Sequence, residues 1–238
     1  MNLTAINQAI RAMCSEVESL RGSKPDWLLL PEEKLLHEAA ICIFGSQMVF
    51  EVAVAAADRV RAKGLLSLGI NTFRQFHKYE ADLLSTLSKP LSVEVNGRRR
   101  QMLPRFRNRL ASLLASTVET IHGGGSSLRE ILLSARSARH ARELLVGAVS
   151  GFGPKQASLF LRRVGFCSEL AILDTHILDY LMIARGIDPK PKALSNLSSY
   201  ERIEIEFQRV AAWFGYAIGC VDLAIWITMR IAKREGVL

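Results

Sequence analysis

Cysteine is scarce in this sequence, and the few cysteines lie far apart. The 238 residues include four of them, with no C-x-x-C pair and no spacing typical of a disulfide framework or a zinc site. We therefore expect reduced thiols in a cytoplasmic protein, with no metal centre and no organic cofactor. The four are Cys14, Cys42, Cys167 and Cys220.

Long hydrophobic runs are also rare. Ala39 to Ala57 comes closest to the roughly 20 apolar residues that a membrane-spanning helix needs. Gly45-Ser-Gln47 interrupts this run and Glu51 follows, so it predicts two buried helices that meet at the break. The N-terminus is amphipathic rather than basic and then apolar, which indicates no secretory signal. These features predict a protein without a membrane span.

No series of β-strands is visible, although Asn96-Gly97 is a turn signal that suggests a small hairpin or loop. Apolar residues recur at helical spacing, so we predict an all-α fold, with two helical lobes around a groove in a single domain over residues 1–238. Ser198 and Glu201 have the spacing of a capping box at one helix start. The predicted helices cover residues 2–20, 31–44, 47–63, 72–88 (one or two short helices), 104–121, 127–148, 154–165, 175–185, 198–213 and 221–234, the last two separated by Gly215 and Gly219.

The most informative stretch is Val149-Ser-Gly-Phe-Gly-Pro-Lys155, here called the glycine hairpin. A helical segment precedes it, Gly151 and Gly153 permit a tight turn, and Pro154 suits the first position of a second helix. Backbone N–H groups at such a helix start can bind a phosphate, with support from the helix dipole. An ordinary turn between two packed helices would have the same pattern.

Lys155 is a candidate nucleophile at the start of the second helix. Helical spacing places it opposite the apolar stripe of that helix, close to Ser158, Leu159 and Arg162. A cation is disfavoured in the first turn of a helix, so a purely solvated lysine would be better placed elsewhere. In a site that excludes water, a lysine amine can lose its proton and attack carbon. A solvated surface lysine is the alternative.

Asp174 is a candidate partner for Lys155. It precedes a predicted helix over residues 175–185, where it would serve as the N-cap, and Gly186 would end that helix. The alternative is that Asp174 only caps this helix. A carboxylate held at a helix start is, however, also well fixed for catalysis.

Taken together, Gly151-Phe-Gly-Pro-Lys155 and Leu173-Asp-Thr-His-Ile177 resemble the helix-hairpin-helix GPD superfamily of DNA base-excision glycosylases. The lysine and aspartate resemble those of its bifunctional 8-oxoguanine DNA glycosylase/lyases, especially the compact prokaryotic type. The resemblance implies that Lys155 is the nucleophile, that Asp174 is its catalytic partner, and that residues 139–186 form the hairpin and catalytic segment.

The resemblance also implies ligands. Gly151, Phe152 and Gly153 would clamp a DNA phosphate, and the hairpin carbonyls would hold a monovalent cation, as in the family. The partner would be double-stranded DNA that contains a damaged base, bound by a monomer. The absence of a four-cysteine cluster argues against the iron–sulfur branch of the superfamily.

Four further residues are secondary candidates. By resemblance Gln47 would fill the gap left by an extruded base, or else cap a helix, and Trp226 would stack on that base, or else pack in the core. Phe152 either touches DNA or packs between the helices, and packing is favoured. His176 is expected to orient its neighbours near DNA rather than to bind a metal.

Basic residues exceed acidic ones, 31 to 23, which gives a formal net charge of +8 and suits a polyanionic partner. Arginines between Arg98 and Arg109 have a density suited to backbone phosphates, although such runs are often solvated faces. The prokaryotic enzymes typically end in a lysine that reads the lesion, whereas this sequence ends Lys233-Arg-Glu-Gly-Val-Leu238. Excision of 8-oxoguanine is therefore predicted together with its alternatives: action on another modified base or nucleotide, or DNA binding without catalysis.

Overall fold

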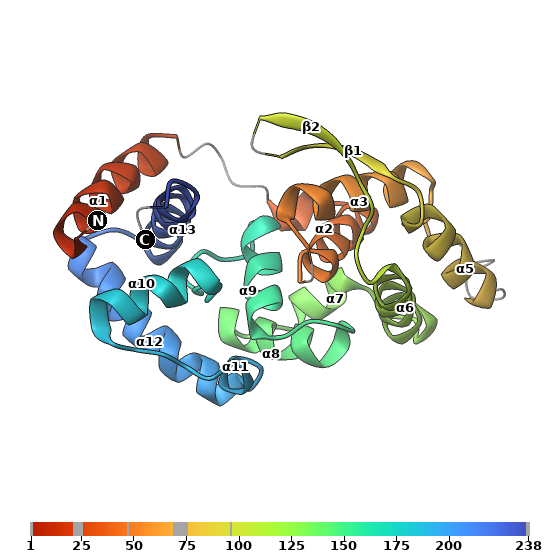
Figure 1. Cartoon of the computed structure of the whole chain (residues 1–238). Helices are drawn as coiled ribbons and strands as arrows, with labels where there is room; N and C mark the ends of the chain where they lie inside the picture. Colours follow the sequence, from red (N-terminus) through yellow and green to blue (C-terminus); the bar gives the residue numbers. More distant parts are fainter. Residues whose placement is uncertain (1, 21–25, 47, 69–75, 96, 237–238) are drawn as a thin grey trace. The chain divides into compact units, whose positions relative to one another are not determined.

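The computed structural model describes residues 2–20, 26–46, 48–68, 76–95 and 97–236 (Figure 1). The chain divides into two compact units. Both ends of the chain contribute to the terminal unit, Met1–Pro25 with Gly153–Leu238, and the central unit is Asp26–Phe152. The prediction of one domain over the whole chain, with a groove between two lobes, stays a prediction.

The terminal unit consists of helices, and α13 lies at its centre. α1 and α10 both pack against α13, as Figure 1 shows for the first and last helices of the chain, and α12 also contacts it. Its described residues form α1 (Leu3–Ser19), α9 (Pro154–Arg163), α10 (Thr175–Arg185), α11 (Pro191–Leu194), α12 (Leu197–Phe214) and α13 (Ile218–Arg234).

α1 confirms the amphipathic N-terminal helix. The Asn2 side chain caps it by accepting a hydrogen bond from the Ala5 backbone N–H at 2.9 Å. Ile6, Ile10 and Cys14 recur at every fourth position and are fully buried in the core of the terminal unit. The helix is therefore held by its apolar stripe and begins where its cap places it.

The last two helices correct two sequence-based predictions. The capping box of Ser198 and Glu201 is wrong, because Asn196 caps α12 by accepting from the Ser199 N–H at 3.0 Å. Contrary to the prediction, Gly219 does not interrupt a helix but lies within α13. A Cβ at Gly219 would lie 3.0 Å from the Ser168 carbonyl oxygen, so this glycine allows close backbone approach rather than a turn.

In the central unit, the apolar run from Ala39 to Ala57 forms two helices, α2 (Glu32–Phe44) and α3 (Phe50–Ala62), as predicted. They pack against each other, and α2 is buried from Leu35 to Phe44. No helix among the described residues is by itself long and apolar enough to cross a membrane. α12 and α13 together, bent by 90°, have the length and composition of a broken span.

A two-stranded antiparallel ribbon follows α5 (Phe76–Leu87), where the turn signal suggested a hairpin or loop. β1 (Leu91–Val95) and β2 (Arg98–Met102) pair in register from Leu91 opposite Met102 to Val95 opposite Arg98. β1 packs against α3, beside which the ribbon runs in Figure 1. The all-α prediction is confirmed, with this ribbon as the sheet that the described residues contain.

The rest of the central unit has more breaks than the apolar spacing predicted. The helix expected over 104–121 becomes α6 (Arg107–Val118) and a π-helical turn, Glu119–Gly123. The helix expected over 127–148 is two, α7 (Leu128–Leu133) and α8 (Ala138–Ala148). Serines explain the second split: Ser127 and Ser137 each accept a hydrogen bond from the backbone N–H three residues on, which starts a new helix at each.

Candidate active site

The turn of the glycine hairpin requires glycine at position 151. Gly151 has a left-handed φ of 87°, and a Cβ there would lie 2.9 Å from a methyl group of Leu113 on α6. The Phe152 N–H donates to the Val149 carbonyl at 3.0 Å and closes the turn. Both the backbone conformation and the close approach of α6 therefore disfavour a larger residue.

After the turn, α9 begins as the sequence predicted. Gly153 is its N-cap, with extended backbone and no side-chain cap, and Pro154 is its first helical residue. The start of α9 therefore keeps backbone N–H donors that no side chain of the cap uses, which is the arrangement that binds anions. Lys155 is the second helical residue and is half-buried.

The apolar stripe of α9 is confirmed, since Ala157, Phe160, Leu161 and Val164 are all fully buried. Ser158, which we expected on the open side near Lys155, is also fully buried. Its hydroxyl donates to the Pro154 carbonyl at 2.9 Å, so it satisfies the first turn of α9 instead of facing a ligand.

Asp174 caps α10 with one of its two carboxylate oxygens. Oδ1 accepts from the backbone N–H groups of His176 at 2.9 Å and Ile177 at 3.0 Å. Oδ2 has no hydrogen bond within the residues that the structure describes, so a second partner can bind there. The helix ends at Gly186, whose φ of 67° gives the predicted left-handed stop.

The loop that leads into Asp174 is held by buried side chains. The Tyr200 hydroxyl accepts from the Leu173 N–H and donates to the Ala171 carbonyl, both at 2.9 Å. Glu204, one helical turn further along α12, accepts from the Ala171 N–H at 2.9 Å. Tyr200 and Glu204 are both fully buried, so these bonds are shielded from water.

A second set of bonds links this loop to the helix of Lys155. Arg162 on α9 donates to the Leu170 carbonyl at 2.6 Å and to Asp222 Oδ2 at 3.1 Å. The same Asp222 oxygen accepts from the Ile172 N–H at 2.6 Å. Burial raises the pKa of Asp222, while the Arg162 guanidinium and the Ile172 N–H act in the opposite direction.

These contacts fix the two candidate catalytic residues on one scaffold. Arg162 lies two helical turns after Lys155, and its bonds end in the loop that precedes Asp174. Within the described residues, no ion pair of 4 Å or less joins Lys155 directly to Asp174. The structure thus connects the segments that carry the lysine and the carboxylate, and the contact between the two side chains stays a prediction.

His176 and Trp226 come together on α10 and α13. Their rings meet edge to face with centroids 6.2 Å apart, and the Arg230 guanidinium lies 4.8 Å from the Trp226 centroid. Lys233, on the same face of α13, pairs with Asp179 of α10. Trp226 is half-buried in this cluster, so its ring is partly accessible.

Burial lowers the pKa of His176, and the nearby charges of Lys233 and Arg230 lower it further, whereas Asp174 and Asp179 raise it. Nδ1 of His176 is buried and has no hydrogen-bond partner in the part of the chain that is described. A neutral ring beside Asp174 suits an orienting residue.

The remaining predicted residues are placed as follows. Phe152 is 7 % exposed, as the packing interpretation expects. Gln47 lies outside the described residues. No group of three or more His, Cys, Asp or Glu side chains among residues 2–20, 26–46, 48–68, 76–95 and 97–236 is arranged to hold a metal ion.

Sequence reasoning missed the residues that hold the Asp174 loop. Glu204 and Asp222 lie on the apolar faces of their helices, where a buried carboxyl needs a partner, and this was the available signal. Arg162 was noticed as a neighbour of Lys155 but not as a loop ligand. Arg230 and Lys233, at helical spacing from Trp226, were also missed.

Comparison with known protein families gives a match to most of the chain. The profile of a family described as 8-oxoguanine DNA glycosylase matches residues 27–216. An 8-oxoguanine DNA glycosylase/AP lyase of Korarchaeum cryptofilum is 42 % identical over 99 residues, which are 42 % of this chain and 46 % of that protein. One from Methanocaldococcus jannaschii is 37 % identical over 100 residues, 42 % of this chain and 47 % of that protein. The chain thus spans about half the length of these curated relatives.

Two solved structures share the fold. The 8-oxoguanine glycosylase/lyase of Methanocaldococcus jannaschii in complex with a 15-mer DNA containing 8-oxoguanine has a TM-score of 0.65 and 24 % identity, covering 98 % of this chain and 90 % of that one. The 8-oxoguanine DNA glycosylase of Thermotoga maritima has a TM-score of 0.64 and 23 % identity, covering 94 % and 89 %.

Proposed function

Because the chain belongs to the 8-oxoguanine DNA glycosylase family, we propose that it is a bifunctional DNA glycosylase and AP lyase that excises 8-oxoguanine from double-stranded DNA. The observation that carries the proposal is the shared scaffold of Lys155 and Asp174. Both residues begin helices inside the matched region, and Arg162 and Asp222 join the helix of the lysine to the loop of the carboxylate.

In the proposed reaction, the target nucleotide leaves the base stack so that its C1′ atom becomes accessible. The neutral Lys155 amine attacks C1′, the bond from C1′ to the base nitrogen breaks, and the base leaves with the bonding electron pair and is protonated. Asp174, through the Oδ2 that capping leaves unused, supports the positive charge that develops at C1′ and orients the lysine.

The lysine then forms a Schiff base. The amine loses a proton as the sugar ring opens, and the resulting iminium acidifies the hydrogen atoms on C2′. Loss of one of these protons breaks the bond from C3′ to its oxygen, which cuts the strand and leaves the phosphate on the downstream fragment. Hydrolysis of the imine regenerates Lys155.

The hairpin would bind the DNA backbone. The uncapped start of α9 offers N–H groups to a phosphate, and the tight turn at Gly151 brings backbone close to the ligand. The carbonyls of Ser150 and Gly151 accept no backbone hydrogen bond within the described residues, and carbonyl oxygens suit a monovalent cation. A cation held there would supply positive charge for the same phosphate. His176 would orient the site, and Trp226 would stack on the extruded base.

Borohydride trapping tests the proposal. The wild type should form a covalent adduct with a duplex containing 8-oxoguanine, Lys155→Gln should form none, and Asp174→Asn should form far less. Lys190→Gln is the control, because Lys190 is an exposed lysine of the same unit. No adduct from the wild type, or an undiminished one from Lys155→Gln, would refute the assignment.

A panel of damaged bases then separates the alternatives. Base release from another lesion, with none from 8-oxoguanine, would move the activity to that substrate. Salt-dependent duplex binding that survives Lys155→Ala and Asp174→Asn, with no base release from any lesion, would indicate a DNA-binding module.

A further inference from the structure

The positive charge of the chain is concentrated in one short segment. Between Lys89 and Arg109 there are seven basic residues and one acidic residue, Glu94, so this segment carries +6 of the total formal charge of +8. The other residues of the chain are therefore close to neutral. The run of arginines noted in the sequence begins on β2 and continues to the start of α6.

The segment begins with the β1–β2 ribbon, Leu91–Met102, here called the arginine ribbon. Its base is anchored to α3, where the two terminal nitrogens of Arg59 donate to the carbonyls of Lys89 and Pro90, each at 2.7 Å. Leu91 and Val93 of β1 are buried. The inner strand is therefore fixed, and the outer strand is presented on a stable base.

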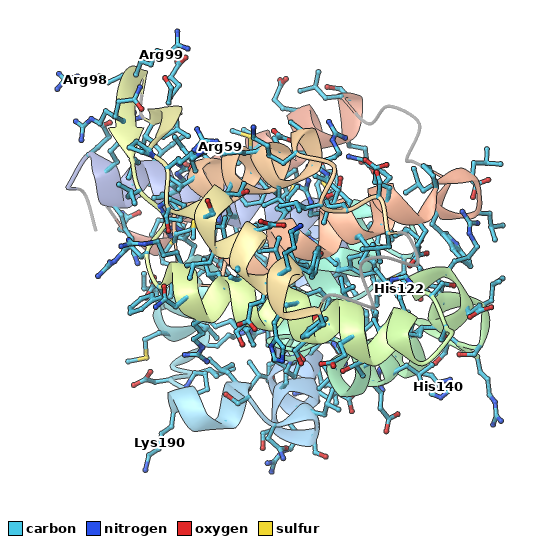
Figure 2. The ribbon with its side chains drawn as sticks, turned by 90° about the vertical axis from the view of Figure 1, so that its right-hand side faces the viewer. Arg59, Arg98, Arg99, His122, His140 and Lys190 are labelled. Carbon is cyan, nitrogen blue, oxygen red and sulfur yellow. The ribbon has the colours of Figure 1, made fainter. Side chains whose placement is uncertain are left out.

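The outer strand presents three consecutive arginines. Arg98, Arg99 and Arg100 are all exposed, and because side chains alternate along a strand, Arg99 lies on one face of the ribbon and the other two on the opposite face. Figure 2 shows Arg98 and Arg99 extending away from the end of the ribbon. Arg99 Nε donates to the Ser92 hydroxyl at 2.8 Å, which orients its guanidinium.

These guanidinium groups have no acidic partner in the part of the chain that the structure describes. Within the described residues none of the three makes an ion pair of 4 Å or less, although Glu94 lies directly opposite Arg99 in the register. Charged residues on an edge strand can also prevent sheet-to-sheet aggregation. That role does not require three adjacent arginines, two of which, Arg98 and Arg100, share one face of the ribbon and repel each other.

We propose that the arginine ribbon is a second DNA contact, separate from the glycine hairpin, which binds backbone phosphates of the duplex. This inference rests on the proposed function. Arginine forks match phosphate oxygens. A strand of five residues is about 17 Å long, and a DNA strand advances roughly 3.4 Å per nucleotide. The ribbon is therefore about as long as five nucleotides of one strand. Because it would contact phosphates and not base edges, its binding should not depend on the DNA sequence.

Salt dependence of duplex binding tests this contact. The probe is an undamaged duplex of about 25 base pairs, and the variant carries Arg98→Gln, Arg99→Gln and Arg100→Gln. Each lost phosphate contact lowers the slope of log K against log salt by about 0.9, so the slope should fall by about 2 to 3. At 0.1 M salt this corresponds to a loss of affinity of up to about 500-fold that vanishes towards 1 M salt.

Two controls make the result specific. Changing the same three arginines to lysine keeps the charge and should retain most of the salt slope. Changing Lys190, Arg202 and Arg209 to glutamine removes the same charge from exposed positions of the terminal unit and should leave the slope nearly unchanged. An unaltered slope in the ribbon variant, or an equal loss in the terminal-unit control, would overturn the inference.

The test separates this inference from the proposed function. Half-saturation of single-turnover base excision should need more of the ribbon variant than of the wild type, in proportion to its loss of duplex affinity, because the ribbon contributes to binding. If the wild type excises 8-oxoguanine but the ribbon variant binds the duplex as tightly as the wild type, the ribbon contact is refuted and the proposed enzymatic function stands. Ribbon-dependent binding of polyglutamate, with no effect on duplex DNA, would indicate an acidic protein partner and overturn the DNA assignment.

Discussion

The Tyr200 hydroxyl lies at the centre of the loop that carries Asp174, and replacing Tyr200 with phenylalanine removes it without opening a cavity. The hydroxyl bridges the Leu173 N–H and the Ala171 carbonyl, each at 2.9 Å. Ala171 and Tyr200 are fully buried, and Leu173 is 2 % exposed. Water therefore cannot replace the lost hydroxyl unless the loop opens.

The expected cost follows from these two groups. A buried donor or acceptor left without a partner costs about 1–3 kcal/mol, so Tyr200→Phe should lower the free energy of unfolding by roughly 2–5 kcal/mol. Partial relaxation of the loop would give the lower value. For a chain of this size about 1 kcal/mol corresponds to a fall in Tm of about 2–4 °C, which predicts a decrease of roughly 5–15 °C.

Urea and thermal unfolding followed by circular dichroism measure this effect. Tyr216→Phe is the matched control, because Tyr216 is half-buried in the same unit and its hydroxyl makes no hydrogen bond within the described residues. Its effect should stay below about 0.5 kcal/mol. If the proposed function holds, Tyr200→Phe should also slow single-turnover excision with little change in duplex affinity. A Tyr200→Phe variant as stable as the control would show that the hydroxyl does not hold the loop.

Three further predictions concern stability, each with a substitution that tests it. Gly151→Ala should lower the free energy of unfolding by about 1–2 kcal/mol because of the left-handed φ at this position. Gly147→Ala, in an open helical position, should instead raise it by about 0.5–1 kcal/mol. Equal effects of the two substitutions in urea unfolding would contradict this prediction. Asp222→Asn leaves the largely buried Arg162 guanidinium without its counter-charge and should lower the free energy of unfolding by about 3–5 kcal/mol. Asp179→Asn, in a surface ion pair, should lower it by less than about 1 kcal/mol. Similar losses in the two variants would refute the stabilising role of the buried ion pair. The pKa of His176 is lowered in the folded protein, so near pH 6.5 the unfolded chain binds a proton more readily than the folded one. The contribution of His176 to stability should therefore be complete above that pH and be lost as the pH falls below it. His176→Gln should reduce this decrease, and an unchanged pH profile would show that His176 does not cause it.

Local signals carried most of the sequence analysis. Pro154 and Gly153 at the start of α9, and Asp174 and Gly186 at the ends of α10, act within a few residues of their position. Their effect is therefore visible in the sequence, and the structure confirms it. The break after Gly45 likewise separates α2 from α3 as predicted.

Predictions failed where two local signals competed or where the partner is distant in the sequence. Asn196 wins over Ser198 as the cap of α12, although both are good capping residues. Gly219 was read as a helix breaker, but its role depends on the Ser168 backbone 51 residues away. Arg162 and Asp222 are 60 residues apart, and helical spacing alone cannot indicate such a pair.

The hydrogen bonds of the Asp174 loop explain why these distant residues are needed. Residues 171, 172 and 173 belong to no helix or strand, and their consecutive backbone N–H groups donate instead to side chains of α12 and α13, namely Glu204, Asp222 and Tyr200. Arg162 lies beside Asp222, one of the two carboxyl acceptors, and also donates to the Leu170 carbonyl, so it ties the helix of Lys155 to the same loop. The three acceptors are 27, 33 and 50 residues away from the N–H groups that they bind. The position of Asp174 therefore depends on contacts between segments that are distant in the sequence, and spacing along a single helix cannot indicate them.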